Sequence, residues 1–582
     1  MEENKAEMND LEKLRHSAAH VLAQAVKELF PDTKLGIGPV IEDGFFYDFG
    51  RKEPFTNEDL KKLEEKMKEI SKQNLKIEKV ELNEKEINAL KKSEPFKKEL
   101  LEDLSKKGIR PTFYKQGNFV DLCRGPHVNY TAKVKAFRLL KVSGAYWKGD
   151  QSKEQMQRIY GTCWPTKEEL ESYLKRLEEA EKRDHRRLGK ELELFTFMEE
   201  SPGAVFFLPK GAVVYNELLK FIREEYVKRD YEEVITPLLY DKSLWETSGH
   251  WEHYRNDMFT LKVDNRDFGI KPMNCPSHLL IYKLKLRSYK DLPWRVADFA
   301  SLHRNEVKGA LGGLTRTRKF SQDDAHIFVA EEQVQEEIGR CIDFVKHVYV
   351  EVFGFTFDTV LSTMPEKALG EPKLWENAEK ALASALDKNN MKYTVAKGEG
   401  AFYGPKIDFK VKDAIGRTWQ LATIQLDFNL PKRFEVTYEG KDGKKHTPVM
   451  IHRAIFGSLE RFIGVMTEHF AGKFPLWLSP VQVRLLTVTD RAVKFAEEVQ
   501  SQLKKANVRV ELDSRLETIP KKVRDAQLDN IPLMVTIGDK EVDNKTLAVR
   551  TLDGKVKFGV KPNDFLSLIT SNIKGRELEI KL

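Results

Sequence analysis

The sequence has few cysteines and no long apolar run. Its four cysteines, among 582 residues, are scattered along the chain. Sparse and scattered cysteines do not make the disulfide framework of a small secreted domain, and they favour a reducing compartment. The first ten residues are polar, without the apolar core of a signal peptide, and no run approaches the roughly 20 apolar residues of a membrane span. We therefore expect a soluble, cytoplasmic protein with no membrane segment.

Neither sign of charge dominates. Lys and Arg number 98 against 91 Asp and Glu, which gives a formal net charge of +7. So mild an excess permits nucleic-acid binding without requiring it, because local patches matter more than the sum. Hydrophobic residues make up 41% of the chain, which excludes a disordered protein, and the length predicts three or four domains.

A polar hairpin is predicted between Ala297 and Phe328. Two strand-like runs with period-two alternation flank a glycine-containing loop, Gly309 to Arg318. The polar side chains of this hairpin are Arg304, Glu306, Arg316, Arg318, Gln322, Asp324 and His326. Such a face is costly to build unless a polar, anionic ligand binds it. An isolated Arg-x-Glu pair would favour a salt-bridged surface hairpin instead, but the complete string is much more specific.

The hairpin resembles motif 2 of the class II aminoacyl-tRNA synthetases. The resemblance implies that Arg304 binds the α-phosphate of ATP and the acyl carboxylate. It implies in the same way that Glu306 binds the adenine amino group and that Phe320 stacks on the adenine ring. The fold it implies is an α+β multidomain protein, with an antiparallel β-sheet catalytic core flanked by helices.

Two further segments resemble motifs 1 and 3 of the same family. The predicted strand Glu233–Pro237 corresponds to motif 1, which builds the dimer interface in the family, so a homodimer is implied. Gly457–Phe462 corresponds to motif 3, whose arginine, here Arg461, packs on adenine and reaches the γ-phosphate. Arg304, Arg316 and Arg461 would together supply charge where the pyrophosphate leaves, and Mg²⁺ is expected beside the phosphates.

Three distant residues match the zinc ligands of the threonyl-tRNA synthetases, a family within this class: Cys275, His326 and His452. Prolines on both sides predict that Cys275 is a fixed loop residue, and one buried cysteine taken alone is more often inert packing. Because the three are far apart in sequence, the zinc ion is implied by the resemblance and not by spacing. Three protein ligands leave a fourth position open for substrate.

The same resemblance implies the remaining residues of the pocket. Strands are predicted over residues 401–408 and 418–427, which alternate with period two. The implied threonine-binding residues are Met273, Gln322, Asp324, Tyr403, Lys406 and Gln425. Gln420 and Thr423 join the ATP-binding set, and His250 matches a residue assigned to the transfer step.

A first domain is expected over residues 1–165. Its opening helix, residues 11–30, carries two histidines on one face, and a loop after a short strand near residue 122 carries a cysteine and a histidine. These four residues have pairwise the spacing of zinc ligands: His16 and His20, and Cys123 and His127. The alternative is that they are ordinary half-buried residues.

The two pairs resemble the editing domain shared by threonyl- and alanyl-tRNA synthetases. In the alanyl type the set holds zinc, whereas in the threonyl type it forms a metal-free hydrolytic pocket. Lys97 and Asp121 match further editing positions of the threonyl type. We therefore expect a metal-free pocket in which a water, oriented by the histidines, attacks the aminoacyl ester. The ubiquitin-like domain with which threonyl enzymes often begin does not fit before Leu11.

Residues 166–192 are almost uniformly Glu, Lys and Arg, with helically spaced leucines, and they predict one solvated linker helix. Its basic end, residues 182–187, is a candidate for contact with RNA phosphates. The catalytic domain is expected to follow over residues 193–478.

From residue 479 to 582, β-α alternation predicts a small three-layer α/β domain. It resembles the anticodon-binding domain of the threonyl, prolyl and histidyl enzymes. Glu541 and Arg550 match positions that read anticodon bases, whereas Leu516 stands where a polar base-contacting residue is found in the family.

Together these resemblances predict ATP-dependent activation of L-threonine to threonyl-adenylate and its transfer to the 3′ end of tRNA(Thr). Valine lacks the hydroxyl that zinc and Asp324 are expected to bind, so valine leaves polar groups unpaired. Serine is only one methyl smaller, a difference worth about 10–200-fold, so a hydrolytic site must remove seryl-tRNA(Thr). A prolyl-type enzyme would leave the three implied zinc ligands unexplained. A non-catalytic RNA-binding paralogue is disfavoured by the three phosphate-site arginines.

Overall fold

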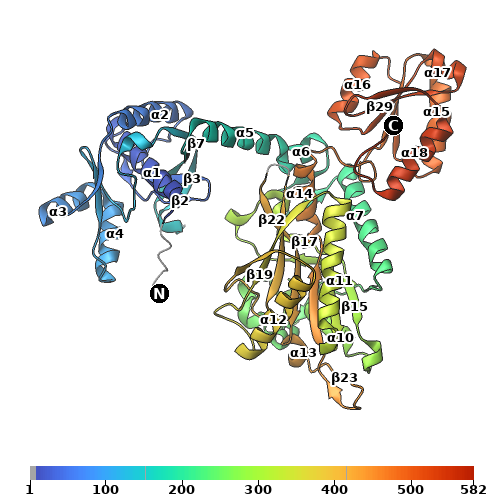
Figure 1. Ribbon diagram of the computed structural model, residues 1–582, viewed down its shortest axis with the longest axis horizontal. Helices are drawn as coiled ribbons and strands as arrows, with labels where there is room; N and C mark the ends of the chain where they lie inside the picture. Colours follow the sequence, from blue (N-terminus) through green and yellow to red (C-terminus); the bar gives the residue numbers. More distant parts are fainter. Residues whose placement is uncertain (1–7, 151–152, 414–415, 582) are drawn as a thin grey trace. The chain divides into compact units, whose positions relative to one another are not determined.

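The structure, a computed structural model, describes residues 8–150, 153–413 and 416–581 (Figure 1). The chain forms two compact units, residues 1–178 and residues 179–582. The division falls inside the segment that the sequence predicts as a linker.

Unit 1 opens with helix α1 (Asp10–Leu29), as predicted. Asn9 caps it: the Asn9 side chain accepts from the Glu12 N–H (2.9 Å), and the Glu12 carboxylate accepts from the Asn9 N–H (2.8 Å). Residues 14–26 of the helix are buried on every side, between the antiparallel sheet and helix α2 in the core of the unit. The strands of that sheet are β1 (Lys34–Leu35), β2 (Val40–Ile41), β3 (Gly44–Gly50), β7 (Ala136–Tyr146) and β8 (Gln155–Trp164).

A second, three-stranded sheet in unit 1 positions the loop that carries Cys123 and His127. Its order is β4-β5-β6, and both pairings are antiparallel. Helices α2 and α3 each begin with a capping box, at Thr56 and at Asn83. The elements are α2 (Asn57–Lys72), β4 (Ile77–Val80), α3 (Glu84–Ser93), α4 (Pro95–Lys106), β5 (Phe113–Gln116) and β6 (Phe119–Leu122).

The predicted single linker helix is wrong in one respect, because the chain forms two helices, α5 (Lys167–Arg183) and α6 (His185–Glu191). Asp184 separates them, since its carboxylate accepts from the Arg186 N–H (2.8 Å) and caps the start of α6. The helix α6 is not wholly solvated either: its residues His185, Leu188 and Gly189 are buried.

The centre of unit 2 is a mostly antiparallel sheet whose eight strands all lie within the described residues. In spatial order they are β11 (Glu232–Glu233), β15 (Trp294–Asp298), β18 (Asp324–Val329), β25 (Val449–Ala454), β22 (Thr418–Asp427), β21 (Lys406–Lys412), β19 (Thr356–Ser362) and β20 (Tyr393–Ala396). Helices pack against one face of this sheet and form the main core with it (Figure 1). They are α11 (Val334–Lys346), α12 (Pro372–Lys388) and α14 (Leu459–His469), with α7 (Pro209–Lys228) against α14.

Shorter elements complete the catalytic part of unit 2. The strands are β9 (Phe195–Phe197), β10 (Val205–Phe207), β12 (Leu239–Asp241), β13 (Thr260–Val263), β14 (Arg266–Ile270), β16 (Ser301–His303), β17 (Lys319–Ser321), β23 (Tyr438–Glu439) and β24 (Lys445–His446). The helices are α8 (Lys242–Ser248), α9 (His250–His253), α10 (Cys275–Tyr282) and α13 (Leu430–Arg433).

Proline positions explain two differences from the predicted elements. The predicted strand Glu233–Pro237 ends early: the Val234 N–H still donates to Ala297 O (2.8 Å), but Pro237 has no N–H with which to continue the ladder. The strand predicted from residue 401 begins only at Lys406, directly after Pro405, so Tyr403 precedes it.

Three candidate site residues also lie in other elements than predicted. Cys275 is the first residue of helix α10 and not a loop residue, because Pro276 occupies an early helical position where a missing N–H leaves no bond unmade. Arg304 and Glu306 lie just past β16 and not within a strand. The Arg304 N–H still donates to Arg318 O (2.9 Å), so the predicted hairpin itself is confirmed.

The C-terminal part of unit 2 is a mixed five-stranded sheet with helices, as predicted. Its order is β27-β26-β28-β29-β30, parallel over the first three strands and antiparallel over the last three. The elements are β26 (Val483–Thr487), α15 (Val493–Lys505), β27 (Val510–Asp513), α16 (Ile519–Leu528), β28 (Leu533–Ile537), α17 (Asp539–Asn544), β29 (Leu547–Thr551), β30 (Val556–Val560) and α18 (Pro562–Gly575).

Candidate functional site

The register of the central sheet assembles a polar row from four strands. His326 of β18 pairs with His452 of β25, which pairs with Gln425 of β22, which pairs with Lys406 of β21. Directly paired residues lie on the same face of a sheet, because side chains alternate along each strand. Their neighbours in sequence point the other way: Ile424, next to Gln425, belongs to the apolar core on the opposite face.

Three donor atoms meet at one end of this row. The Cys275 Sγ and one nitrogen each of His326 and His452 all lie within 4.8 Å of one another, and the three residues are buried. His326 Nε2 and His452 Nδ1 are 2.9 Å apart. One thiolate and two imidazoles are the donor types that a zinc ion prefers, and three of them leave a fourth position open. The residues present therefore fit a zinc ion.

Two residues that the sequence did not single out orient the two imidazoles. The Nε2–H of His452 donates to Asp427 Oδ2 (3.0 Å), which leaves Nδ1 free to face the other donors. His278 Nδ1 lies 2.7 Å from His326 Nδ1 and leaves His326 Nε2 facing inward. Outer partners of this kind fix the tautomer and orientation of metal-binding histidines. Asp427 follows Thr423 and Gln425 at period two, which is the one sequence signal that could have identified it.

Burial shapes the charge of this cluster. It raises the pKa of the Cys275 thiol and lowers the pKa of His326, so both groups favour their neutral forms when no cation is near. Burial also raises the pKa of Asp324, whose Oδ2 accepts from the Asn274 amide (3.1 Å). A cation bound by Cys275 and the two histidines would stabilise the thiolate.

The residues implied for the amino-acid pocket gather around the cluster. The Tyr403 ring centre lies 5.1 Å from that of His452, and the Gln425 amide donates to Gly404 O (3.0 Å). Asp324 is two residues from His326 on β18, so both face the same side. Gln322 is half-buried between β17 and β18. These residues supply both polar atoms and an aromatic wall beside the three donors.

His250, implied in the transfer step, is fully buried on the same side. Its Nδ1 lies 2.8 Å from Ser248 Oγ and its Nε2 lies 3.1 Å from the Met273 sulfur. Burial lowers the pKa of His250 to about 3, and the nearby Arg304 acts in the same direction. The ring is therefore neutral at pH 7.

The arginines of motifs 2 and 3 converge through the hairpin loop. Arg461 Nε donates to Thr315 O (2.8 Å) and its Nη1 donates to Gln420 O (3.0 Å). The Arg304 guanidinium lies over the Phe320 ring, 4.9 Å from its centre. Burial lowers the pKa of Arg461, and repulsion from Arg316 and Arg304 lowers it further. A polyphosphate between these three guanidinium groups would relieve that repulsion.

Glu306 and Arg316 pair with each other across the loop. Arg316 Nη2 lies 2.8 Å from Glu306 Oε2, and the Arg316 side chain is half exposed. An exposed ion pair of this kind is weak. Both groups are therefore easily recruited by a ligand that offers them other partners.

The sequence reasoning missed Asp408, which organises three of the implied residues. Its carboxylate is buried and lies 2.7 Å from Lys406 Nζ. It also accepts from the Gln420 amide (2.7 Å), the Thr423 hydroxyl (3.0 Å) and the Ser362 hydroxyl (3.1 Å). Lys406 and Asp408 lie two residues apart on β21 and therefore face the same side of the sheet. Gln420 and Thr423 reach the same carboxylate only because β21 pairs with β22.

Unit 1 holds a second cluster, in which three of the four predicted residues converge. Cys123 Sγ lies 3.2 Å from both His16 Nε2 and His127 Nε2. The Nδ1–H of His16 donates to Pro126 O (3.2 Å), so its Nε2 is unprotonated. Ser17 Oγ already donates to Lys13 O, so it accepts the Nδ1–H of His127, whose Nε2 is therefore unprotonated too. Two bare nitrogens thus point at one thiol.

His20 belongs instead to a neighbouring group around Asp121. Its Nε2 lies 3.7 Å from Asp121 Oδ2, and Lys97 Nζ lies 2.7 Å from Asp121 Oδ1. Burial lowers the pKa of His20 to about 4 despite the nearby Asp121. Burial alone would raise the pKa of Asp121, but Lys97 and His20 hold it below its ordinary value.

Burial controls the protonation of the convergent cluster. It lowers the pKa of His16 and that of His127, and it raises the pKa of the Cys123 thiol to about 12. At pH 7 the cluster therefore consists of two neutral imidazoles and a neutral thiol. Neutral imidazoles with a free nitrogen can accept a hydrogen bond from water, but the lowered pKa values make them weak bases.

The two residues implied in anticodon reading lie on separate elements of the C-terminal sheet domain. Glu541 lies in α17, where its carboxylate accepts from the Gly538 N–H (3.0 Å), and Arg550 lies on β29. Leu516 is 91% exposed. The Leu516 side chain has no polar atom with which to hydrogen-bond a base, although it lies at the surface.

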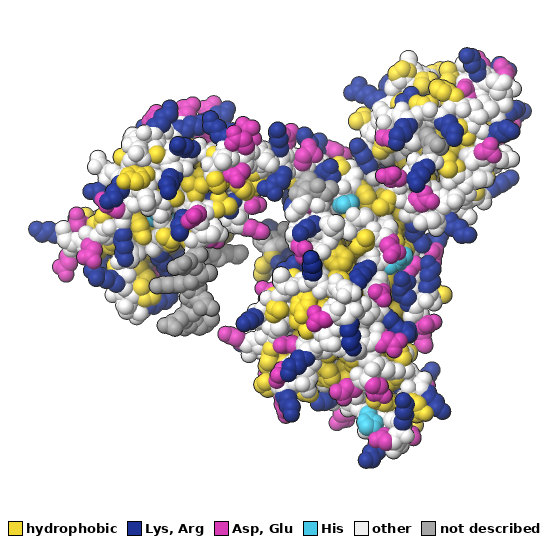
Figure 2. Space-filling model, viewed as in Figure 1, with side chains coloured by type: hydrophobic (Ala, Val, Ile, Leu, Met, Phe, Trp, Pro, Cys, Tyr) yellow, Lys and Arg dark blue, Asp and Glu magenta, His cyan; other side chains and the backbone are white. Residues whose placement is uncertain are grey.

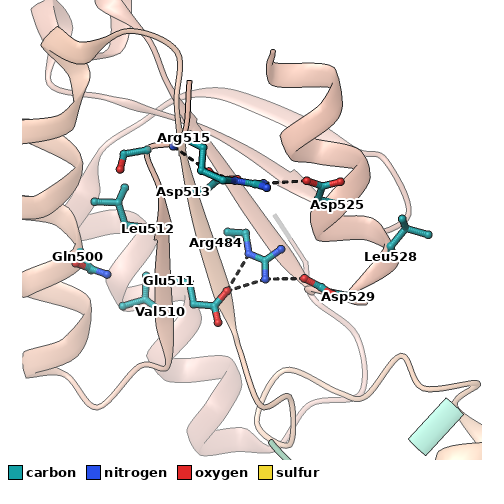
Figure 3. A pocket seen from close by; sticks show the side chains of 11 residues that line it. Arg484, Gln500, Val510, Glu511, Leu512, Asp513, Arg515, Asp525, Leu528 and Asp529 are labelled. Atoms are coloured by element: carbon teal, nitrogen blue, oxygen red, sulfur yellow. Dashed lines mark hydrogen bonds and ion pairs between the residues drawn. The ribbon is translucent and has the colours of Figure 1, made fainter. Parts of the chain in front are cut away.

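A hollow in the same domain, drawn in Figure 3, contains neither implied anticodon residue. Two arginines cross it, and each is held by carboxylates. Arg484 lies between Glu511 (2.7 Å) and Asp529 (2.8 Å), and Arg515 lies between Asp513 and Asp525. Because both cations already have partners, this hollow is a poor anion site.

The surface carries mixed charge. On the face drawn in Figure 2, Lys and Arg side chains are intermingled with Asp and Glu. Among the described residues, no helix combines the length and the apolar character needed to span a bilayer.

Three families match separate parts of the chain. Residues 259–470 match the tRNA synthetase class II core domain (G, H, P, S and T), and residues 482–572 match an anticodon binding domain. Residues 112–160 match the threonyl and alanyl tRNA synthetase second additional domain. That segment includes Asp121, Cys123 and His127.

Similar proteins carry one name over nearly the full length. The chain is 51% identical to the threonine–tRNA ligase of Acetivibrio thermocellus over 97% of its residues and 89% of that protein. It is 50% identical to that of Clostridioides difficile over the same shares. The crystal structure of the RNA binding domain of threonyl-tRNA synthetase from Cryptosporidium parvum is 44% identical, with a TM-score of 0.65, over 69% of this chain and 99% of that one.

A more distant likeness separates the specificities. A prolyl-tRNA synthetase structure from Cryptosporidium parvum has a TM-score of 0.53 over 67% of this chain and 74% of that one, at 19% identity, which shows a shared fold alone. The half-identical relatives are threonine–tRNA ligases, so the prolyl alternative is not supported. The chain belongs to the threonine–tRNA ligase family of class II aminoacyl-tRNA synthetases.

Proposed function

We propose that this protein is a threonine–tRNA ligase that joins L-threonine to tRNA(Thr) at the expense of ATP and hydrolyses mischarged seryl-tRNA(Thr). The observation that carries the choice of amino acid is the convergence of Cys275, His326 and His452 beside Asp324. The name borne by the half-identical relatives supports the same conclusion.

The pocket would hold zinc through Cys275, His326 and His452. When bound, zinc supplies a Lewis-acid position that takes the amino group and the side-chain hydroxyl of threonine. Asp324 accepts a hydrogen bond from that hydroxyl, while Met273, Gln322, Tyr403, Lys406 and Gln425 surround the amino acid. Valine would leave the buried Asp324 carboxylate without its partner, and such unpaired buried groups give stronger discrimination than a difference in shape.

The phosphate side of the pocket is built from the motif residues. Arg304 holds the α-phosphate beside the acyl carboxylate, and Arg316 and Arg461 hold the outer phosphates with Mg²⁺. Glu306, Phe320, Gln420 and Thr423 hold the adenosine moiety. Support comes from the convergence of Arg304 and Arg461 on the hairpin loop and from the shared carboxylate of Asp408. His250 acts in the transfer of the aminoacyl group to the terminal ribose.

Unit 1 would remove serine from the tRNA. His16 and His127 present bare nitrogens that can accept hydrogen bonds from a water and orient it, with Cys123 between them. The buried ion pair of Lys97 and Asp121, with the neutral His20 beside it, would form the wall of the pocket that receives the aminoacyl group. The metal-free interpretation is supported by His20, whose ring packs against that of His127 (4.6 Å between ring centres) but whose Nε2 faces Asp121 and does not join the three convergent donors.

A homodimer is supported by apolar side chains left exposed near motif 1 and after α10. Ile235 is 91% exposed, Leu284 79% and Leu286 101%. Exposed apolar surface on this scale is typical of protein contacts. All four cysteines are free, which suits the reducing cytoplasm in which we place the enzyme. Glu541 and Arg550 would read the anticodon.

The test is amino-acid-dependent exchange of pyrophosphate into ATP with threonine, serine, valine and proline. We expect rapid exchange with threonine, weaker exchange with serine, and none above background with valine or proline. Exchange that is fastest with proline or valine would refute the proposed specificity. Exchange with no amino acid would refute the enzymatic function itself.

A further inference from the structure

His185, the first residue of α6, lies outside every site described above, yet its side chain is only 5% exposed. Its ring is packed between two glycines. A Cβ on Gly313 of the hairpin loop would lie 2.4 Å from His185 Nε2, and a Cβ on Gly464 of α14 would lie 3.6 Å from the ring. The ring therefore fills the space between the motif 2 loop and the motif 3 helix.

Both ring nitrogens of His185 have partners, and the partners decide its tautomer. The Leu314 N–H can only donate, and it lies 3.0 Å from His185 Nε2, so Nε2 must be the acceptor. The proton is then on Nδ1 and is donated to Glu468 Oε1 (2.7 Å). The backbone N–H of His185 donates to the same Glu468 oxygen (3.1 Å).

Asp184, His185 and Glu468 lie close enough together to suggest a cation site. Their hydrogen bonds favour another interpretation. Both nitrogens of His185 are occupied, Asp184 caps α6 and pairs with Arg186, and the second oxygen of Glu468 contacts Arg417. The cluster is a hydrogen-bonded brace from α6 and α14 to the loop.

The brace ends on the segment of loop that carries the phosphate-site contacts. Three consecutive residues are each held by a different element. Leu314 N–H is held by His185, Thr315 O accepts from Arg461 Nε (2.8 Å), and Arg316 pairs with Glu306 (2.8 Å). A shift of Leu314 would therefore displace Arg316, two residues further along the loop. It would also displace Arg461, because Arg461 donates to the carbonyl of the next residue, Thr315.

We propose that His185 is a positioning residue for ATP: it accepts the Leu314 N–H and thereby sets the loop that places Arg316 and Arg461 at the phosphates. The inference rests on the proposed function, because it assumes that those arginines bind ATP. It assigns a role to the helix that precedes the catalytic core, where the sequence indicated a solvated linker with a basic end.

Two substitutions separate the acceptor from the rest of the side chain. A glutamine amide reaches about as far as Nε2, so His185→Gln can still accept from Leu314. An asparagine amide reaches only the position of Nδ1, so His185→Asn keeps a donor for Glu468 and loses the acceptor. Glu191→Gln is the matched control, since Glu191 lies on α6, is exposed, and pairs with Arg187 on the same helix.

Two measurements are made on the full chain. Hydrogen exchange with mass spectrometry follows the Leu314 amide in peptides covering residues 311–318, and pyrophosphate exchange gives separate KM values for ATP and for threonine. Loss of a hydrogen bond to a buried N–H predicts a roughly tenfold rise in the ATP KM for His185→Asn, with faster exchange at Leu314. The threonine KM should stay within twofold. His185→Gln should restore the ATP KM to within about threefold of wild type, and Glu191→Gln should match wild type in both measurements.

Three outcomes would overturn the inference. One is an ATP KM within twofold of wild type in His185→Asn. The second is an equal rise of the ATP and threonine KM values, which would indicate general loss of structure. The third is His185→Gln behaving as His185→Asn. If the wild-type protein shows no threonine-dependent exchange, the proposed function fails and this inference fails with it; an active wild type with an unchanged His185→Asn refutes the inference alone.

Discussion

Asp408→Asn is the substitution that tests the catalytic pocket most sharply, because one carboxylate serves three implied substrate-binding residues. Oδ1 accepts from Gln420 and Thr423, and Oδ2 accepts from Lys406 and Ser362. In the asparagine variant one oxygen becomes an NH₂ group. If the remaining oxygen stays with Gln420 and Thr423, the new donor faces the Lys406 ammonium, which is also a donor.

The magnitude follows from the bond that is lost. A hydrogen bond to a charged group contributes about 1.5–3 kcal/mol, and each 1.4 kcal/mol corresponds to a tenfold change. We therefore expect kcat/KM for threonine-dependent pyrophosphate exchange to fall by roughly 10- to 150-fold. The Lys406 side chain is only 18% exposed, so water replaces the carboxylate poorly and the upper half of that range is favoured.

The assay compares three variants by pyrophosphate exchange and by melting temperature. Asp358→Asn is the control, because Asp358 of β19 pairs (2.7 Å) with Lys412 of β21, the strand that carries Asp408, but both side chains are exposed. Its activity should match wild type. The double variant Asp408→Asn/Lys406→Met should be no less active than Asp408→Asn if the carboxylate acts mainly through Lys406. An Asp408→Asn protein that is folded and within threefold of wild-type activity would refute the reasoning.

Three other predictions concern unit 1 and the assembly. His16→Ala should let seryl-tRNA(Thr) accumulate while threonine activation stays within twofold of wild type; unchanged seryl-tRNA hydrolysis would contradict the role of the cluster. Burial lowers the pKa of His20 from 6.5 to about 4. Between pH 6.5 and pH 4 the unfolded chain therefore binds a proton at this residue that the folded chain does not bind. The free energy of unfolding falls by up to about 3 kcal/mol as the pH drops through this range. The melting temperature of His20→Gln should therefore depend less on pH between 6.5 and 4 than that of wild type, and an identical slope would refute the shift. Ile235→Asp should shift the protein from dimer to monomer in sedimentation experiments, whereas a stable dimer in this variant would place the interface elsewhere.

The sequence predicted the elements of the fold better than their ends. Periodicity identified β22 with Thr423 and Gln425, and the helix that carries His16. It could not show that Pro276 begins a helix at Cys275, because proline is tolerated in the first turn and also favours loops. It placed Arg304 inside a strand, since alternation continues for a few residues after the ladder has ended.

The candidate site depended on pairings that no local pattern contains. His326 and His452 are 126 residues apart, and only the register of β18 against β25 places them side by side. For the same reason Asp408 was visible only as a strand residue, because its partners Gln420 and Thr423 come from the neighbouring strand. The role proposed for His185 requires contact between α6 and a loop more than a hundred residues away.

The central claim is that Cys275, His326 and His452 hold one zinc ion that selects threonine. Its most direct test is the zinc content of the purified full-length wild-type and Cys275→Ser proteins, measured by elemental mass spectrometry. The account predicts one zinc ion per wild-type chain and none in Cys275→Ser, whose threonine-dependent exchange is lost at the same time. Active wild-type protein without zinc, or a Cys275→Ser protein that still activates threonine, would contradict it.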